Sequence, residues 1–167
     1  FEALAGDVVS ISMDTPLADG VGCASLTLAN AAGSTLAWNE TGGPDNDAFI
    51  SRYVIPTSGT YYVLAEGRYS YYGYYYTGSY ELRVDVARGI QLETDPEYSN
   101  DTISGANVLS LQQGAPGHLV ATVAGTVMSP QGSNTDEDLF AWGTLNAGNV
   151  VELNVRLPSS SSLLPRV

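Results

Sequence analysis

The sequence predicts an all-β fold: an antiparallel, jelly-roll-like β-sandwich of eight or nine strands with at most one short helix. Three observations predict it. Short stretches of alternating apolar and polar residues recur along the chain, as in strands that bury one face. Turn-forming sequences rich in Gly, Pro, Asn and Asp separate these stretches. The composition, with 18 Gly, 11 Tyr and only 14% charged residues among 167, favours short strands and tight turns over long helices.

The first half of the chain contains most of the predicted strands. Alternation is clearest at Val9, Ile11 and Met13, whose side chains share one face of an extended segment. A turn sequence containing Gly33, and later one ending at Gly59, mark places where the chain reverses. The predicted strands of this half are residues 8–13, 25–28, 35–38, 49–55, 60–65 and 79–86.

The second half begins with a polar linker, residues 89–101, which contains Pro96. Residues 102–109 are the one helix candidate, because Asn100 or Asp101 could cap its N-terminus. Alternation then predicts strands at residues 119–127, 139–142 and 150–155. A serine run, residues 159–162, is expected to form a loop.

One short passage occurs twice, near the two ends of the chain. Residues 5–13 (AGDVVSISM) match residues 147–155 (AGNVVELNV), and the same offset of 142 residues aligns Pro16 with Pro158. Each copy is a turn ending in Gly, followed by an alternating strand. The simplest interpretation is that the chain spans slightly more than one period of a tandem-repeat protein, with the boundaries inside a repeat.

The charge pattern excludes some partners. The formal net charge is −12, all six basic residues are Arg, and there is no Lys. Such a chain is expected to repel nucleic acid and anionic membranes and to attract metal cations. No apolar run is long enough for a membrane span. Cys23 is the only cysteine, so no disulfide forms within the chain, and we expect it to be a small buried hydrophobic residue.

Two stretches resemble the two halves of one domain family. Residues 97–109 (EYSNDTISGANVL), 123–127 (VAGTV), 136–140 (DEDLF) and 145–149 (LNAGN) give an acidic Asn-Asp linker, an Ala-Asn pair, a Gly-containing strand, Asp-x-Asp-x-Phe and a Gly turn. This series resembles the opening half of the bacterial pre-peptidase C-terminal domain family. The family comprises small secreted sandwiches and includes the collagen-binding modules of bacterial collagenases.

Residues earlier in the chain resemble the closing half of a domain of the same family. The matching pieces are residues 4–7, 31–33, 38–40, 55–63 (IPTSGTYYV) and 77–82 (TGSYEL), and the last two are the most specific. The order is therefore inverted, in agreement with the repeat. The resemblance implies that residues 1–88 are the closing half of one sandwich and that residues 89–101 are an acidic linker. Residues 102–167 are then the opening half of the next sandwich, completed within the chain or with a neighbouring chain.

An acidic cluster is predicted to bind calcium, which takes six to eight oxygen ligands. Asp136 and Asp138 lie two residues apart and so share one face of a strand, where their repulsion favours a bound cation. The resemblance implies calcium held between the linker carboxylates and this pair. The alternative is a solvated acidic linker that binds nothing specific. The candidate ligands are Glu93, Asp95, Glu97, Asn100, Asp101, Asp136 and Asp138.

A second group of oxygen-bearing side chains lies in a Gly-rich loop, at Asn39, Glu40, Asp45, Asn46 and Asp47. Asp and Asn in loops usually form turns, and we favour that interpretation over a second metal site. Neither group has the spacing of a helix–loop–helix calcium site, and neither has His or Cys partners for zinc.

A tyrosine-rich stretch, residues 68–78, lies between two predicted strands and is expected to form the long tip of a hairpin. Consecutive tyrosines cannot all face a core, so some must face water or a partner. Three interpretations remain: a recognition surface for protein or glycan, a contact between neighbouring repeats, or an aromatic ladder over one sheet face. The candidate interface residues are Tyr69, Tyr71, Tyr72, Tyr74, Tyr75 and Tyr76.

No catalytic constellation is found. His118 is the only histidine and has no nucleophile motif near it, so we expect it to lie on the surface. The expected function is a non-catalytic structural or adhesive repeat module of a secreted or surface protein, stabilised by calcium and assembling head to tail by strand complementation into a fibre. The alternative is an accessory module of a secreted hydrolase that binds collagen-like protein or polysaccharide. Expected partners are neighbouring copies of the chain and, in the alternative, an extracellular protein or glycan.

Overall fold

The computed structural model describes residues 1–16, 23–67, 76–159 and 161–164. Strands dominate, and the helical residues that it contains form two short 3-10 turns, η1 (Pro44–Asn46) and η2 (Pro96–Tyr98). The strands of the first half are β1 (Glu2–Ala3), β2 (Val8–Asp14), β3 (Ala24–Asn30), β4 (Thr35–Asn39), β5 (Ala48–Val54), β6 (Gly59–Gly67) and β7 (Glu81–Ala87). Those of the second half are β8 (Gln91–Leu92), β9 (Asn107–Val108), β10 (Gln112–Gln113), β11 (Leu119–Val120), β12 (Val123–Ala124) and β13 (Phe140–Ala141).

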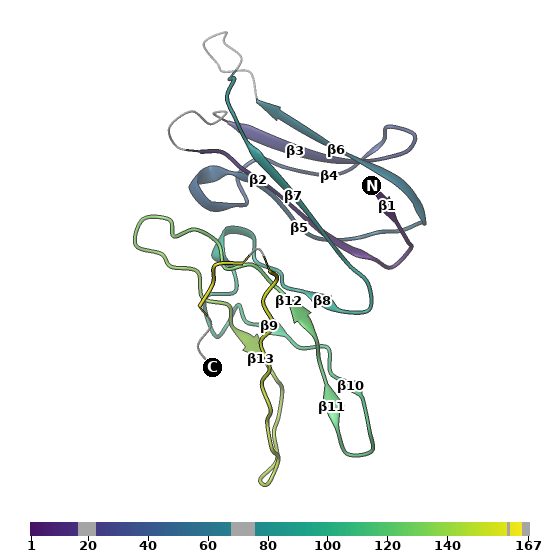
Figure 1. Cartoon of the computed structure of the whole chain (residues 1–167), viewed down its shortest axis with the longest axis vertical. Coiled ribbons are helices and arrows are strands. Elements are labelled where there is room, and N and C mark those ends of the chain that lie inside the picture. The colour runs from purple at the N-terminus through teal and green to yellow at the C-terminus, as the bar shows by residue number, and fades with distance from the viewer. Residues whose placement is uncertain (17–22, 68–75, 160, 165–167) are drawn as a thin grey trace.

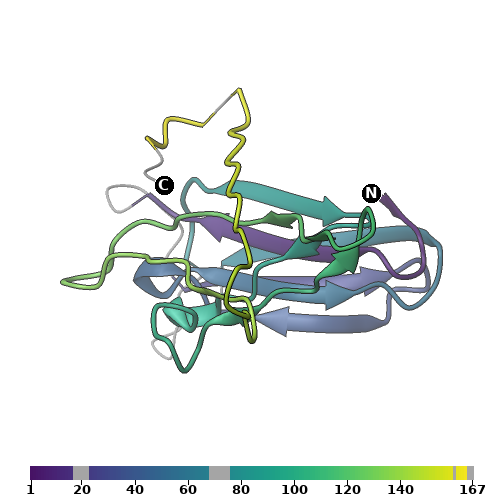
Figure 2. The same cartoon turned by 90° about the horizontal axis from the view of Figure 1, so that it is seen from below.

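The first seven strands form two antiparallel sheets packed face to face (Figures 1 and 2). One sheet has the strand order β1-β6-β3-β4, and the other has the order β5-β2-β7. The prediction of an all-β sandwich is therefore confirmed. All six strands predicted before residue 88 are present, with shifts of a few residues at their ends.

Strand β2 is the centre of the core. Val9, Ile11 and Met13 point into the sandwich and are essentially inaccessible to solvent, as the alternation predicts. They face Leu26 and Leu28 of β3, which are also fully buried. On its two edges β2 pairs with β5, with a register shift between Val9 and Ile11, and with β7, so it is the central strand of its sheet.

A buried carboxylate fixes the turn before β2. Asp7 accepts two hydrogen bonds from Arg88, from Nε at 2.8 Å and from Nη2 at 2.7 Å, and a third from the backbone N–H of Leu4 at 2.8 Å. The Arg88 guanidinium holds the pKa of Asp7 down at about 2, and the Leu4 amide adds to this effect.

The Asp7–Arg88 pair predicts an acid-dependent loss of stability. Because the folded-state pKa lies below the unfolded value, the contribution of the pair is complete above pH 4 and is lost as the pH falls through about 2. Asp7→Asn is expected to lower the urea midpoint at pH 7 and to reduce the difference between midpoints at pH 4 and pH 2. Asp85→Asn, which removes the exposed Arg83–Asp85 pair, is the control and should change little.

The second half of the chain is built from two-residue strands. Strands β10 and β11 form an antiparallel hairpin, whereas β12 pairs with β8 and β13 pairs with β9 in parallel. These parallel pairs differ from the antiparallel arrangement that we expected throughout. They arise because the linker runs alongside later segments of the chain: Glu93 N–H donates to the Ala124 carbonyl, and Gln91 N–H donates to the Thr122 carbonyl.

Three local predictions are wrong, two in the second half of the chain and one for Cys23. Residues 102–109 form a turn, in which Gly105 N–H donates to the Thr102 carbonyl, and then strand β9; no helix forms there because Thr, Ile, Ser and Gly are weak helix formers. The predicted strand 119–127 is split into β11 and β12, which pair with different partners. Cys23 is exposed, with a left-handed φ of 52° immediately before β3, and is not a core residue.

The duplicated passage keeps its turn but not its strand. Gly6 and Gly148 have φ values of 87° and 92°. In the first copy Asp7 N–H donates to the Leu4 carbonyl at 3.0 Å, and in the second Asn149 N–H donates to the Asn146 carbonyl at 3.0 Å. The side chain of each residue also accepts the reverse bond at 2.8 Å. Residues 150–155, however, form no strand, which corrects the prediction, because no segment within the described part of the chain pairs with them.

Candidate metal site

The linker after β8 is held in a compact bend. Pro96 begins η2, and Glu97 and Tyr98 both have left-handed φ values, 56° and 57°, which are uncommon for residues other than Gly. Glu97 N–H donates to the Gly42 carbonyl at 2.9 Å, and the Tyr98 hydroxyl donates to the Ser129 carbonyl at 2.6 Å. The bend is thus braced on one side by the sandwich and on the other by the segment after β12.

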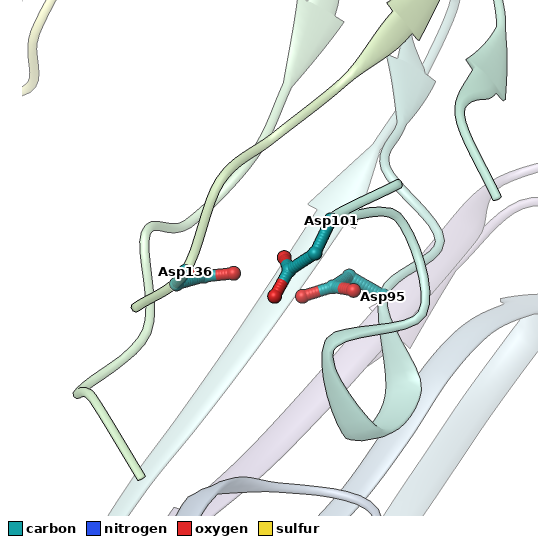
Figure 3. A group of neighbouring side chains, drawn as sticks. All are labelled: Asp95, Asp101 and Asp136. Atoms are coloured by element: carbon teal, nitrogen blue, oxygen red, sulfur yellow. The ribbon is translucent and has the colours of Figure 1, made fainter. Parts of the chain in front are cut away.

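The bend brings carboxylates together from two distant parts of the chain (Figure 3). One carboxylate oxygen from each of Asp95, Asp101 and Asp136 lies within 4.8 Å of the other two. Asn100 is fully buried among them: its N–H donates to Asp95 Oδ1 at 3.0 Å, and its Nδ2 donates to Asp138 Oδ1 at 3.2 Å. The linker and the Asp-x-Asp pair therefore meet, as the sequence predicts.

Glu93 completes the group on the β12 side. Its Oε1 accepts a hydrogen bond from Thr126 N–H, and Asp138 lies near enough to raise its pKa. Gly125 makes room for this carboxylate, because a Cβ at that position would lie 2.3 Å from Glu93 Oε2 and 2.8 Å from Cδ. Any larger residue must displace Glu93.

The contact at Gly125 gives a direct test. Gly125→Ala is expected to weaken metal binding at this site at least tenfold, because it pushes Glu93 out of the cluster. Isothermal titration with CaCl₂ measures the change. Gly114→Ala is the matched control, since its Cβ would meet Val120 Cγ2 at 3.2 Å and His118 O at 3.4 Å, neither of which belongs to the cluster, and its affinity should match that of the parent. Equal affinities for the parent and Gly125→Ala would contradict the assigned role of Glu93.

Five side-chain oxygens of this cluster are buried and accept no hydrogen bond from any residue that the structure describes. Each belongs to a different residue: Glu93 Oε2, Asp95 Oδ2, Asn100 Oδ1, Asp101 Oδ2 and Asp136 Oδ1. The Asp95 side chain is only 1% exposed and that of Asn100 is 0% exposed. A buried acceptor without a partner costs about 1–3 kcal/mol, so such a concentration requires an additional group that attracts oxygen.

Burial makes the cluster unfavourable as a set of free anions. It raises the pKa of Glu93 to about 9 and that of Asp136 to about 7, and it also raises the pKa of Asp95. Like-charge repulsion from Asp138 contributes to the increases at Glu93 and Asp136. The recorded ion pairs of the described chain, Arg83–Asp85 and Arg88–Asp7, do not involve the cluster. Positive charge must therefore come from protons or from a cation.

Without metal, these pKa values predict that the stability of the protein falls as the pH rises, which is opposite to the effect of the Asp7–Arg88 pair. A carboxyl whose folded-state pKa is raised binds protons more tightly when folded, so stability falls as the pH rises from about 4, the unfolded value, to about 9, the value for Glu93. The chelated protein is expected to melt at a higher temperature at pH 5 than at pH 8. With saturating calcium, which displaces those protons, the difference should shrink or reverse. A chelated protein that is more stable at pH 8 would contradict this assignment.

Most of the predicted ligands lie in this cluster. Glu97 is the exception: it is exposed, and its backbone N–H, rather than its carboxylate, makes the recorded contact. Asn107 is a supporting residue that the prediction missed. Its buried amide donates to the Thr94 carbonyl at 2.9 Å and accepts from Thr94 N–H at 2.5 Å, which fixes the linker beside β9. Its place in the Ala-Asn pair of the resemblance was the only available signal.

The oxygens of the second predicted group are used for turn formation. Asn39 Oδ1 accepts from the N–H groups of Thr41, Gly42 and Phe49 at 2.8–3.0 Å. Asp47 accepts from the hydroxyl and from the N–H of Thr15. These contacts support the turn-forming interpretation. Of the predicted tyrosine surface, only Tyr76 lies within the described residues, where it is exposed; Tyr69, Tyr71, Tyr72, Tyr74 and Tyr75 lie outside them.

No family model, curated protein or solved structure matches the chain. Within the described residues, no helix has the length and apolar character needed to cross a membrane.

Proposed function

We infer that the chain is a non-catalytic structural or adhesive repeat module of a secreted or surface protein, stabilised by calcium and able to assemble head to tail with copies of itself. A single observation carries the calcium assignment: five buried oxygens in one cluster have no hydrogen-bond donor. The inferred relationship to the bacterial pre-peptidase C-terminal domain family rests on the sequence resemblance.

Calcium fits the donor set better than other common metals. The six side chains of the cluster offer only oxygen, from the carboxylates of Glu93, Asp95, Asp101, Asp136 and Asp138 and the amide of Asn100. Calcium takes six to eight oxygen ligands in flexible geometry, whereas zinc prefers nitrogen and sulfur and magnesium demands a strict octahedron. The cation's role here is to neutralise the buried carboxylates and to join the linker to the segment before β13.

The location of the site supports a structural role. The ligands come from the linker and from a loop about 40 residues later in the chain, so the ion connects segments rather than activating a substrate. The affinities of extracellular calcium modules, about 10⁻⁴–10⁻³ M, suit a site that stays occupied outside cells. His118 is exposed in the turn before β11, and we assign it no catalytic role.

Direct titration tests the calcium assignment. The chelator-treated chain should bind one calcium ion per molecule in isothermal titration, with the release of protons at pH 7 seen as a dependence of the heat on the buffer. Magnesium should compete weakly. The absence of saturable binding at millimolar calcium would remove the calcium part of the proposal.

A second candidate function, an accessory module that binds an extracellular polymer, is favoured by one feature. A cleft of about 620 Å³ lies between the outer face of β2 and β7 and residues 124–130. Its walls carry Asp14, Asp45 and Glu81, while its Arg83 is paired with Asp85. This charge suits a cationic peptide segment. Pull-down on insoluble collagen, cellulose and chitin distinguishes the two functions, because a purely structural unit should stay in solution.

A further inference from the structure

We propose that residues 150–155 of one copy add as a strand to the open edge of β7 in a second copy. The inference deepens the head-to-tail assembly proposed above, on which it rests, by naming the two surfaces and their register. Each copy carries one donor segment and one acceptor edge. Because these two surfaces differ, copies joined in this way continue in series.

The donor is a strand sequence without a sheet. Residues 150–155 follow the same glycine turn as β2, with the same positive φ at its glycine and the same two hydrogen bonds, and repeat its alternation of apolar side chains. Yet Val151, Leu153 and Val155 are 44%, 56% and 51% exposed, whereas their counterparts in β2 are 0–1% exposed. The segment, yellow in Figure 1, lies outside both sheets of the sandwich, in the second half of the chain. Pairing it therefore costs no existing strand contact among the described residues.

The acceptor is the outer edge of β7. This strand pairs with β2 on one side and is the last strand of its sheet in the described structure (Figure 1). Its side chains Leu82 and Val86 share the core-facing side with Val84 but remain 39% and 42% exposed. The other end of the sheet is less accessible, because the linker contacts β5 there: Asp95 N–H lies 3.4 Å from Ser51 Oγ, and Arg52 Nη1 lies 3.4 Å from Thr94 Oγ1.

The register follows from β2. In the structure Val9 lies opposite Val86, Ile11 opposite Val84 and Met13 opposite Leu82. The offset of 142 residues transfers these positions to Val151, Leu153 and Val155, so the same antiparallel register on the other edge of β7 forms three apolar pairs on the core-facing side. The backbone hydrogen-bond pattern also permits this pairing. The N–H and C=O groups of β7 that point away from β2 face the added strand and can pair with it.

The charge at the end of β7 suits residues 150–156 better than it suits β2. At the end of the ladder Asp14 lies opposite Glu81, a like-charged pair. The same offset places Arg156 opposite Glu81, an opposite-charged pair. The partner that this match indicates is a second copy of the chain, which carries the β7 sequence with which the β2 pattern already pairs. Since each copy has a net charge of −12, association should strengthen as salt screens the long-range repulsion.

Charge reversal tests the proposal in the whole chain with calcium bound. Sedimentation velocity over a range of concentrations at about 150 mM salt should show association of the parent. Arg156→Glu and Glu81→Arg should each weaken association at least tenfold, and the double variant should restore most of it. Glu152→Pro, in a segment that is unpaired in the single chain, should abolish association without changing the melting temperature. A monomeric parent, or variants that associate like the parent, would overturn the proposal.

Cysteine crosslinking tests the register. In a Cys23→Ser background, chains carrying Val155→Cys are mixed with chains carrying Leu82→Cys and oxidised. Mixed dimers are expected with Leu82→Cys but not with Val54→Cys, which lies on the opposite edge strand, β5, and is also exposed. Equal crosslinking at both positions would rule out the β7 edge. A calcium-binding chain that never associates would disprove strand addition alone, whereas association without calcium binding would disprove the calcium part alone.

Discussion

Removal of calcium is expected to lower the melting temperature of this protein by roughly 5–10 °C. The reason is that the proposed calcium ion would bind only the folded cluster, because in the unfolded chain its ligands are dispersed between Glu93 and Asp138. A ligand at 100 times its dissociation constant stabilises the folded state by about 2.7 kcal/mol. For a chain of this length, each kcal/mol shifts the melting temperature by about 2–4 °C. Scanning calorimetry at pH 7.5 with 10 mM CaCl₂ and with excess chelator measures the difference.

Magnesium at the same concentration is the matched ionic control, because it screens surface charge equally but fits the site poorly. A shift of the same size with magnesium would show that general screening of the charge of −12 is responsible. Identical midpoints with calcium and with chelator would remove the metal from the description of the cluster.

Substitution of Asp136 by Asn is expected to have opposite effects with and without calcium. Without metal, at pH 8, the change removes a buried negative charge that lies beside Asp95, Asp101 and Asp138, and should stabilise the protein by roughly 1–3 kcal/mol. The amide oxygen can still accept the hydrogen bond from Met128 N–H. With calcium, the variant has lost a charged ligand and should melt below the parent. Thermal melts of both proteins in chelator and in CaCl₂ give the comparison.

Glu137→Gln is the control for this reversal. Glu137 is adjacent in sequence and equally acidic, but it is exposed and has no role in the cluster beyond its backbone N–H, which donates to Asp101 Oδ1 at 3.1 Å. Its removal should leave the calcium-induced shift unchanged. If Asp136→Asn and Glu137→Gln behave alike, the buried arrangement assigned to Asp136 is incorrect.

The sandwich could be predicted from sequence because its signal is local. Alternation at Val9, Ile11 and Met13 determines which face of β2 is buried whatever its neighbours are, and the glycine turns mark where strands end. Prediction failed where pairing decides the outcome. Residues 150–155 have the same alternation as β2, but a strand also needs a partner, and local sequence carries no information about its presence.

The acidic side chains of the candidate site could be predicted from the sequence, but the residues that hold them in place could not. Two acidic groups separated by about 40 residues suggested a shared cation, since carboxylates gathered on one face repel each other. The helix expected from Asn100 or Asp101 as its cap was wrong, because both residues direct their side chains toward the cluster instead. The roles of Gly125 and Asn107 depend on contacts with Glu93 and Thr94, which alternation and turn sequences do not indicate.

The braced linker has a mechanical consequence. Any pull applied to the two ends of the chain passes from β7 through residues 88–101 before it reaches the second half. The contacts of Glu97 with Gly42 and of Tyr98 with Ser129 lie across that path, as do the carboxylates around Asn100. Extension of the linker must break these contacts first. If calcium binds the cluster as proposed, its concentration sets the force at which the linker yields, so that a series of such units is stiff when calcium is plentiful and compliant when it is scarce.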